Sequence, residues 1–198
     1  ILTALEAGIE RFFPVSEVEE AFKLKEANPG LLLAGERNAL RVPGFDFGNS
    51  PLEHFGKNYA GGQLVCSTTN GTRAIRAARG AQKVILACLR SAQAVASFIQ
   101  DEQDVLFLPA GLAGKFSLED TWCAGLMLSY LQNAELGDGA KVARLIYEEI
   151  PHSKLAESAH GKRLQSLELW KDLEFCLEVN VSSGVVLWDQ DSGWGALV

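Results

Sequence analysis

The stretch GQLVCSTTNGTRAIRAARG, residues 62–80, joins an apolar run directly to a helical pattern. Its first part, GQLVCSTT, predicts a strand, and TRAIRAARG predicts a helix that ends at Gly80. A strand that leads straight into a helix places hydroxyl groups, the N–H groups of the first helical turn and an arginine near one point. Such groups suit a phosphate or sulfonate, so the loop predicts an anion site. Its candidate binding residues are Thr68, Thr69, Asn70, Gly71, Thr72 and Arg73.

This stretch has a structural alternative, and its residues can also be compared with two known phosphate-binding loops. A plain N-cap with an Asn-Gly turn explains the same residues structurally and stays open. Among phosphate-binding loops, no G-x-x-x-x-G-K-[ST] run is present. TTNGT, residues 68–72, imitates the D-x-D-G-T loop of haloacid-dehalogenase phosphatases but lacks both aspartates. Without a carboxylate at position 68, no aspartyl-phosphate can form there.

The rest of the chain alternates between strand and helix patterns in the same way. The alternation predicts an α/β fold with a largely parallel or mixed sheet flanked by helices, and ligands at the strand ends. Ser16 and Glu19 predict a capping box for the first of the longer helices. We expect a single domain over residues 1–198, with a C-terminal α/β subdomain beginning near residue 136 as a variant. Strands are predicted at 12–15, 30–37, 62–69, 83–88 and 104–111, with helices at 17–27, 72–80, 91–101, 117–133 and 139–150.

Composition excludes several classes of protein. The chain has 198 residues and a formal charge of -7, and its Lys and Arg residues are scattered, which argues against a nucleic-acid partner. No apolar run is long enough to span a bilayer. Four cysteines lie far apart without a C-x-x-C pair, which favours buried, reduced thiols in a cytosolic protein. The opening ILTALEAGI reads as a helix without a start signal, so we expect further residues before Ile1.

Two more polar clusters fall at predicted element ends. GERNALRVPGFDFGNSP, residues 35–51, places Glu36 and Arg37 directly after a strand and carries Asp46, Asn49 and Ser50 before Pro51, a helix N1 position. FSLEDTWCAG, residues 116–125, places Glu119 and Asp120 in a first helical turn. Carboxylates near an anion site supply what Mg²⁺ prefers. Capping by Ser117 with Asp120, and an Asx turn at Asp46, are the structural alternatives.

Two further side chains have chemistry that a phosphatase could use. His160, beside Gly161, Lys162 and Arg163, could protonate a leaving oxygen, although a polar-loop histidine is equally compatible with the sequence. Cys66 precedes the anion loop by two residues, and its thiolate is a conceivable nucleophile. A cysteine inside a strand is more often buried and inert.

These stretches together resemble the 2-phosphosulfolactate phosphatase (ComB) family. ILTALEAGI, the 35–51 and 116–125 stretches, STTNGTRAI and SAHGKRLQSLELWKDLEFCLEVN, residues 158–180, occur in that family's order and spacing. The resemblance covers nearly the whole chain. It implies a ComB-like α/β fold and a Mg²⁺-dependent hydrolysis of 2-phosphosulfolactate to sulfolactate and phosphate, a step of coenzyme M biosynthesis. The family also has a strand with an Asp-x-x-Arg type of segment before the helix that matches Ile1 to Gly8.

The resemblance implicates the residues singled out in the 35–51, 68–73 and 116–125 stretches without assigning each a role, and His160 is a candidate because of its neighbours in the sequence. Catalysis is expected from Arg37, Asp46, Arg73, Glu119 and His160, with Mg²⁺ held by members of the set Glu36, Asp46, Glu119 and Asp120. Substrate binding is expected from Asn49, Ser50 and the loop 68–72. The partner is a small phosphorylated acid, and a homo-oligomer is compatible with the sequence. Two alternatives stay open. One is a hydrolase for another phosphorylated hydroxy acid, and the other is an inactive phosphate- or sulfonate-binding protein of the same fold.

Overall fold

The computed structural model describes residues 1–198, which divide into two compact units. Unit 1 comprises residues 1–86 and 186–198, and unit 2 comprises residues 87–185. The assignment of the chain to a single domain stays a prediction. The position near 136 where a subdomain was expected to begin falls inside unit 2, between two of its helices.

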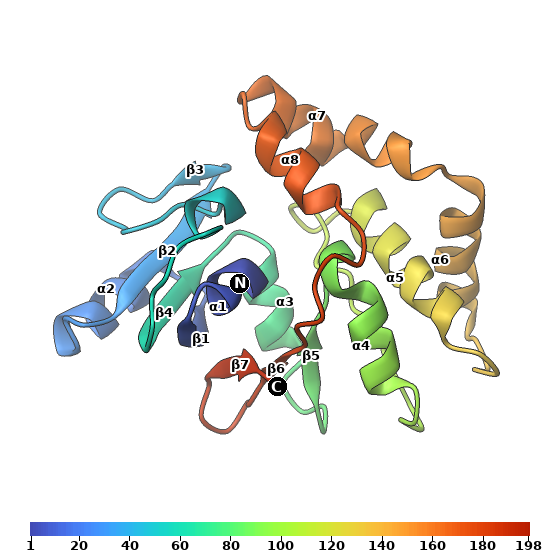
Figure 1. Ribbon diagram of the computed structural model, residues 1–198, viewed down its shortest axis with the longest axis horizontal. Coiled ribbons are helices and arrows are strands. Elements are labelled where there is room, and N and C mark those ends of the chain that lie inside the picture. Colours follow the sequence, from blue (N-terminus) through green and yellow to red (C-terminus); the bar gives the residue numbers. More distant parts are fainter. The chain divides into compact units, whose positions relative to one another are not determined.

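Unit 1 is built on one seven-stranded sheet in the order β3-β2-β4-β1-β7-β6-β5 (Figure 1). The three central strands β2, β4 and β1 are parallel, and every other neighbouring pair is antiparallel. The sheet is therefore mixed, as one of the predicted variants had it. Its strands are β1 (Ile9–Val15), β2 (Leu32–Arg37), β3 (Leu40–Arg41), β4 (Gly62–Ser67), β5 (Val84–Leu86), β6 (Val186–Trp188) and β7 (Gly195–Leu197).

The helices of unit 1 lie before and between its strands. α1 (Leu2–Glu6) precedes β1, α2 (Val18–Ala27) connects β1 to β2, the 3-10 turn η1 (Pro51–Glu53) lies between β3 and β4, and α3 (Gly71–Ala77) follows β4. Apolar side chains of β1, α2, β2 and β4 pack into one buried cluster, because both faces of a parallel sheet have to be covered. Its buried members are Val15, Ala21, Leu31, Leu33, Val42, Phe45 and Val65.

One glycine allows the close approach of two central strands. A Cβ atom at Gly35 of β2 would collide with the carbonyl oxygen of Ser67 of β4. The glycine therefore keeps β2 and β4 in register immediately before Glu36 and Arg37, which end β2.

Unit 2 contains helices and no named strand. It comprises the 3-10 turns η2 (Leu89–Ser91) and η3 (His152–Glu157) and the helices α4 (Ala92–Ile99), α5 (Leu118–Tyr130), α6 (Asp138–Glu149), α7 (Ala159–Ser166) and α8 (Trp170–Leu177). In Figure 1, α5 lies beside α4 and α6, and the facing sides of α5 and α6 share a cluster of Ala124, Leu128 and Ala143.

Two local predictions were wrong. Residues 104–111 form no strand, and Leu106 is 87% exposed there. A short apolar run does not reveal whether a partner strand exists, and Pro109 has no N–H group to donate to a neighbouring strand. Ser16 does not cap α2, whose N-cap residue is Glu17. The Val-rich end of the chain, β6 and β7, joins the sheet of unit 1, and the variant with a C-terminal subdomain stays a prediction.

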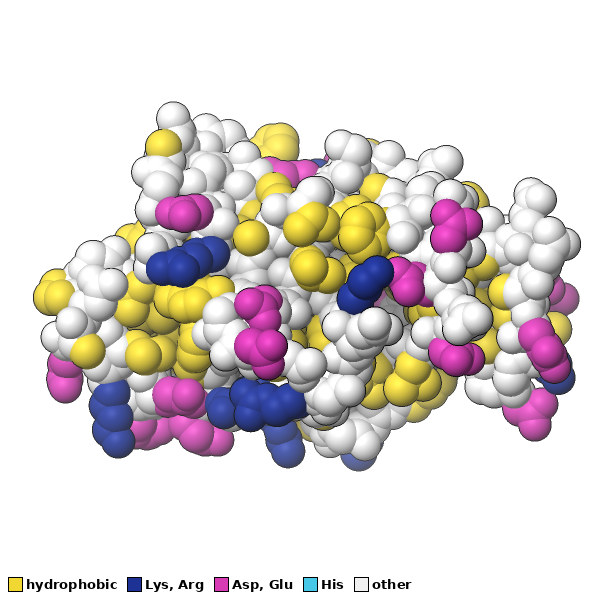
Figure 2. Space-filling model, turned by 90° about the horizontal axis from the view of Figure 1, so that it is seen from below, with side chains coloured by type: hydrophobic (Ala, Val, Ile, Leu, Met, Phe, Trp, Pro, Cys, Tyr) yellow, Lys and Arg dark blue, Asp and Glu magenta, His cyan; other side chains and the backbone are white.

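Surface charge is mixed. On the face that Figure 2 shows, acidic and basic side chains alternate among apolar ones. None of the helices combines the length and the apolar character that crossing a membrane would require.

Candidate active site

Two adjacent parallel strands of unit 1 send their connections in opposite directions. From β1 the chain runs through α2 to β2, beyond β4, and from β4 it runs through α3 to β5, beyond β1. In open α/β sheets, ligands bind outside the carboxyl ends of the strands at such a switch point. Here Ser16 follows β1 and Thr68 follows β4.

Arg37 bridges this switch point. It is the last residue of β2, and its Nη2 donates to the carbonyl oxygen of Ser16 and to Oγ of Ser67, each at 2.9 Å. Its Nη1 donates to the carbonyl oxygen of Glu36 at 2.7 Å. One guanidinium therefore connects the carboxyl ends of all three parallel strands, and its positive charge is fixed at the point where their loops begin.

Glu36 links the same edge to the predicted anion loop. Its Oε1 accepts the N–H of Thr69 at 2.7 Å, and Oε2 accepts the N–H of Ala39 at 2.8 Å. Burial opposes ionisation of this carboxyl, but the two backbone donors, the Thr69 hydroxyl and the charge of Arg37 together outweigh it and hold the pKa of Glu36 below its ordinary value. Glu36 is thus a buried, ionised carboxylate beside the loop.

The loop itself is braced by two threonines. Oγ1 of Thr68 accepts the N–H of Thr72 at 3.1 Å, while Oγ1 of Thr72 donates to the carbonyl oxygen of Thr68 at 2.9 Å. Thr68 therefore caps the start of α3, which favours in part the structural alternative of a plain helix cap. Two N–H groups of the expected anion cradle, those of Thr69 and Thr72, are bonded within the protein.

Arg73 differs from the threonines of this loop, because its side chain does not help to hold the fold together. It is exposed on the first turn of α3 and makes no hydrogen bond or ion pair. Asn70 precedes the helix as its N-cap residue, and Gly71 begins it. The exposed guanidinium of Arg73 and the half-buried one of Arg37 are two groups of unit 1 that suit a phosphate.

The structure does not bring Asp46 to this edge. Its Oδ2 accepts the N–H of Leu33 at 2.8 Å, near the amino end of β2, and lies 3.4 Å from Nζ of Lys25. Three residues of extended chain separate Leu33 from Glu36, roughly 10 Å. These contacts favour the structural interpretation of Asp46.

Asn49 and Ser50 lie closer to the edge than Asp46 does. Phe47 pairs with Ala34 in a parallel bridge, so the chain from Asp46 onward runs in the direction of β2. Ser50 is the N-cap residue of η1, with Pro51 at its first position as predicted, but its side chain makes no capping bond.

The remaining predicted residues belong to unit 2. Glu119 and Asp120 lie in the first turn of α5, where Ser117 accepts the N–H of Asp120 at 3.2 Å, which confirms the predicted cap. Oδ2 of Asp120 accepts the N–H of Gly111 at 2.8 Å. His160 lies in the first turn of α7, and its Nδ1 is buried without a hydrogen-bond partner.

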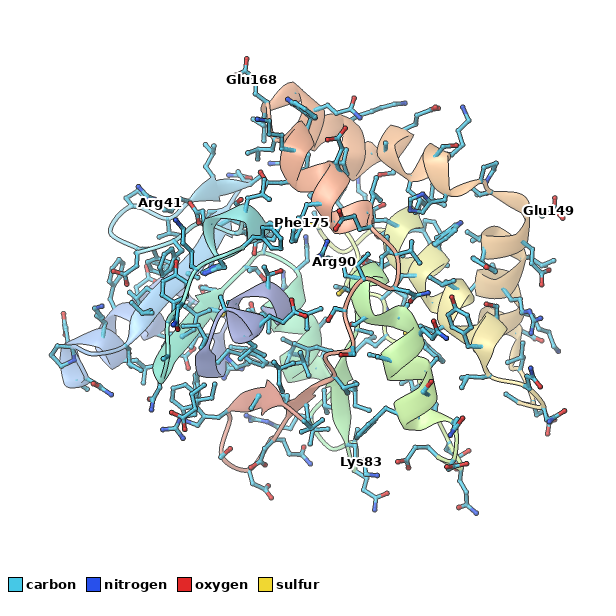
Figure 3. The ribbon with its side chains drawn as sticks, viewed as in Figure 1. Arg41, Lys83, Arg90, Glu149, Glu168 and Phe175 are labelled. Carbon is cyan, nitrogen blue, oxygen red and sulfur yellow. The ribbon has the colours of Figure 1, made fainter.

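Sequence reasoning missed a buried arginine of unit 2. Arg90 lies in η2 and stacks on the Phe175 ring, 3.7 Å from its centroid, and Figure 3 labels the two side by side. Its Nη1 donates to the carbonyl oxygen of Phe175 at 3.0 Å and pairs with Glu178. These contacts fasten the end of α8 to the start of α4, a role that no local pattern around Arg90 signals.

Ser16 and Ser67 were missed at the switch point. Ser67 reads as an interior strand residue, and Ser16 reads as a helix cap. Only the adjacency of β1 and β4 shows that both lie at the same edge.

Cys66 is unsuited to nucleophilic attack. It is buried, and burial raises the pKa of its thiol to about 11, so the thiol is protonated at neutral pH. This favours the inert alternative for Cys66.

Comparison with known proteins assigns the chain to a family. The family model described as 2-phosphosulpholactate phosphatase matches residues 1–191. A protein of Thermotoga petrophila is 41% identical over 89% of this chain and 78% of its own length. One of Carboxydothermus hydrogenoformans is also 41% identical, over 91% of this chain and 77% of its own. Each of these relatives bears the name probable 2-phosphosulfolactate phosphatase. A match of this extent makes the chain a member of the 2-phosphosulpholactate phosphatase family, and with it a phosphatase, a phosphoric monoester hydrolase.

Proposed function

We propose that the chain hydrolyses 2-phosphosulfolactate, or a related phosphorylated hydroxy acid, to the hydroxy acid and phosphate in a Mg²⁺-dependent reaction. The observation that carries the proposal is the Arg37 guanidinium, which spans the switch point of the sheet with the exposed Arg73 on the adjoining loop. The names of the relatives support the substrate. Sulfolactate released in this way would serve coenzyme M biosynthesis.

Arg37 and Arg73 have different parts in this proposal. Arg37 is held at three acceptors, so its charge is in place before substrate arrives, which is the preorganisation that stabilises a transition state electrostatically. The exposed Arg73 guanidinium can donate two parallel hydrogen bonds to phosphate oxygens. Phosphoryl transfer depends mainly on positioning and charge stabilisation, and two guanidinium groups supply both.

Glu36 is the carboxylate of unit 1 that would hold Mg²⁺. No group of three or more His, Cys, Asp or Glu side chains is arranged to hold a metal ion. Mg²⁺ needs only one or two carboxylates when substrate oxygens and waters complete its shell, and the two Glu36 oxygens, which accept the N–H groups of Thr69 and Ala39 and the Thr69 hydroxyl, have about four acceptor positions between them. When bound, the ion would offset charge on the phosphoryl group.

The roles expected for Glu119, Asp120 and His160 of unit 2 stay predictions. Within unit 2, Asp120 is already bonded to the N–H of Gly111, whereas Nδ1 of His160 is buried without a partner. In the overall reaction, water adds across the ester bond, and the hydroxy-acid oxygen leaves with one proton.

A phosphatase screen with metal control tests the proposal. Phosphorylated sulfonates and carboxylates are offered with Mg²⁺, with EDTA, and with Mg²⁺ restored after EDTA. We expect turnover that EDTA abolishes and Mg²⁺ restores. Turnover that persists in EDTA would refute the metal requirement. Phosphate binding without any turnover would identify the alternative, an inactive binding protein of the same fold.

A matched pair of variants assigns the metal carboxylate. Glu36→Gln removes the charge at the edge, and Glu53→Gln changes another unit 1 carboxylate, which accepts the N–H of Gly48. We expect Glu36→Gln to raise the Mg²⁺ concentration needed for half-maximal activity, and Glu53→Gln to leave it unchanged. An equal change in the Mg²⁺ requirement of the two variants would show that Glu36 does not hold the ion.

A further inference from the structure

Ser16 contacts two arginines from different elements. Its carbonyl oxygen accepts from Arg37, and its Oγ lies 3.5 Å from Nη1 of Arg76, on α3. The Ser16 hydroxyl has no part in capping α2. It therefore faces a guanidinium at the carboxyl end of β1, beside the proposed phosphate position.

The partner of Arg76 is easily exchanged. Nη1 of Arg76 lies 3.0 Å from Oε2 of Glu20, and the two side chains are 36% and 38% exposed. Ion pairs of this exposure contribute little to stability, so another anion can replace the carboxylate at little cost. No local pattern indicates this pair, because α2 and α3 are far apart along the chain.

Three arginines belong to this part of unit 1. Arg73 and Arg76 are three residues apart on α3 and therefore neighbours on its surface. The Arg37 guanidinium is bonded to acceptors of the protein, and in the proposed function Arg73 binds the phosphate oxygens. The Arg76 guanidinium, paired with Glu20, is then available to a second oxyanion.

We propose that Arg76 and the Ser16 hydroxyl form a subsite for the second acidic group, a sulfonate or carboxylate, of the phosphorylated acid. This inference rests on the proposed function for the position of the phosphate. The acid group displaces Glu20 from Arg76 and accepts hydrogen bonds from the guanidinium and the hydroxyl. Arg76 would then distinguish acids with two charged groups from simple phosphate esters.

Binding measured without turnover tests the subsite. Three probes are titrated calorimetrically in EDTA: ethyl phosphate, phospholactate and the phosphate ester of 2-hydroxyethanesulfonate. The variants are Arg76→Gln, Glu20→Gln and, as the matched control, Arg79→Gln, an exposed arginine three residues further along the chain that makes no ion pair. Thermal unfolding midpoints establish that each variant is folded.

We expect Arg76→Gln to weaken binding of at least one of the two acids by about tenfold or more and to leave ethyl phosphate unchanged, because the variant loses only hydrogen bonds to the charged group that ethyl phosphate lacks. Loss for the sulfonate alone, or for the carboxylate alone, identifies which group the subsite takes. Glu20→Gln should tighten binding of the same acid, because it removes the competing carboxylate. Arg79→Gln should change none of the three.

Other outcomes overturn the inference. Equal weakening of all three probes by Arg76→Gln shows a general charge effect, and no change shows that Arg76 does not touch the ligand. Failure of the wild-type protein to bind any probe overturns both the subsite and the proposed phosphate position. Selective loss with Arg76→Gln in a protein that hydrolyses nothing would leave the subsite standing and refute only the proposed function.

Discussion

Arg37 and Arg73 carry the same charge at the same edge of the sheet, but only Arg37 is built into the fold. Arg73→Lys keeps the charge and loses the two-pronged geometry, so inorganic phosphate should bind about 10- to 100-fold more weakly, or roughly 1–3 kcal/mol. The unfolding midpoint should stay nearly constant, because the side chain makes no internal bond. Calorimetric titration and thermal denaturation measure the two effects.

Arg37→Lys provides the contrast. A lysine cannot reach Ser16, Ser67 and the Glu36 carbonyl at once, so this variant should lose stability as well as phosphate affinity. If Arg73→Lys destabilised the protein as much as Arg37→Lys, Arg73 would be a structural residue.

Asp46 was predicted as a catalytic residue, and its contacts lead to a different expectation. Asp46→Ala leaves the N–H of Leu33 without its acceptor and should lower the free energy of unfolding by about 1–3 kcal/mol. Asp46→Asn keeps an acceptor oxygen and loses only the partly exposed pair with Lys25, so it should cost less than about 1 kcal/mol. Urea denaturation gives both values. A fully stable Asp46→Asn protein that has lost turnover would restore Asp46 to the catalytic set.

At the scale of elements, the turn after η1 buries a histidine among aromatic rings. His54 lies 4.7 Å from the Phe47 ring centroid and 5.8 Å from that of Tyr59, and its Nδ1 has no partner. Burial lowers the pKa of His54 to about 4. The unfolded chain therefore binds the proton more readily, and stability should fall as pH drops from 6.5 toward 4, by about 1.4 kcal/mol per pH unit at most.

Replacing the titrating group tests this expectation. His54→Phe should flatten the dependence of unfolding free energy on pH between 4 and 6.5. Glu36, whose pKa lies below its ordinary 4.5, loses its contribution only at lower pH, so the two groups act in different windows. An unchanged slope in His54→Phe would show that the histidine is accessible to protons in the folded state.

The contact between α5 and α6 depends on one glycine. A Cβ atom at Gly125 would collide with the carbonyl oxygen of Ala143, so Gly125→Ala should force the helices apart and cost about 1–3 kcal/mol. Gly139, in the first turn of α6, has no atom near its Cβ position, and Gly139→Ala should instead stabilise by about 0.5–1 kcal/mol. Chemical denaturation should show that the free energy of unfolding falls in the first variant and rises in the second. Changes of the same sign in both variants would contradict this packing.

At the scale of the molecule, the chain leaves the sheet of unit 1 after β5 and returns to it only with β6 and β7. β6 pairs with β5, and β7 pairs with β1. Removal of residues 186–198 should therefore lower the protection of β1 and β5 amides against hydrogen exchange while the unit 2 helices keep theirs. Unchanged protection of β1 and β5 would show that the return strands are dispensable.

The sequence determined the local elements where its signals were local. The run before Ser67 and the Asn-Gly turn predicted β4, the loop and α3, and Ser117 with Asp120 predicted the start of α5. A resemblance carried by several separate motifs identified the family, which the family model and the relatives then showed. These signals are readable because a cap, a turn and a strand period each involve residues close together in the chain.

Only the tertiary structure decided which of these residues meet. It brought Ser16 and Ser67 to Arg37, set Arg76 against Ser16, and held Asp46 near the opposite end of β2. It also left residues 104–111 without a partner strand and gave the C-terminal strands to unit 1. Strand order and connection direction fix these outcomes, and both depend on pairings between segments far apart in sequence, which no local pattern records.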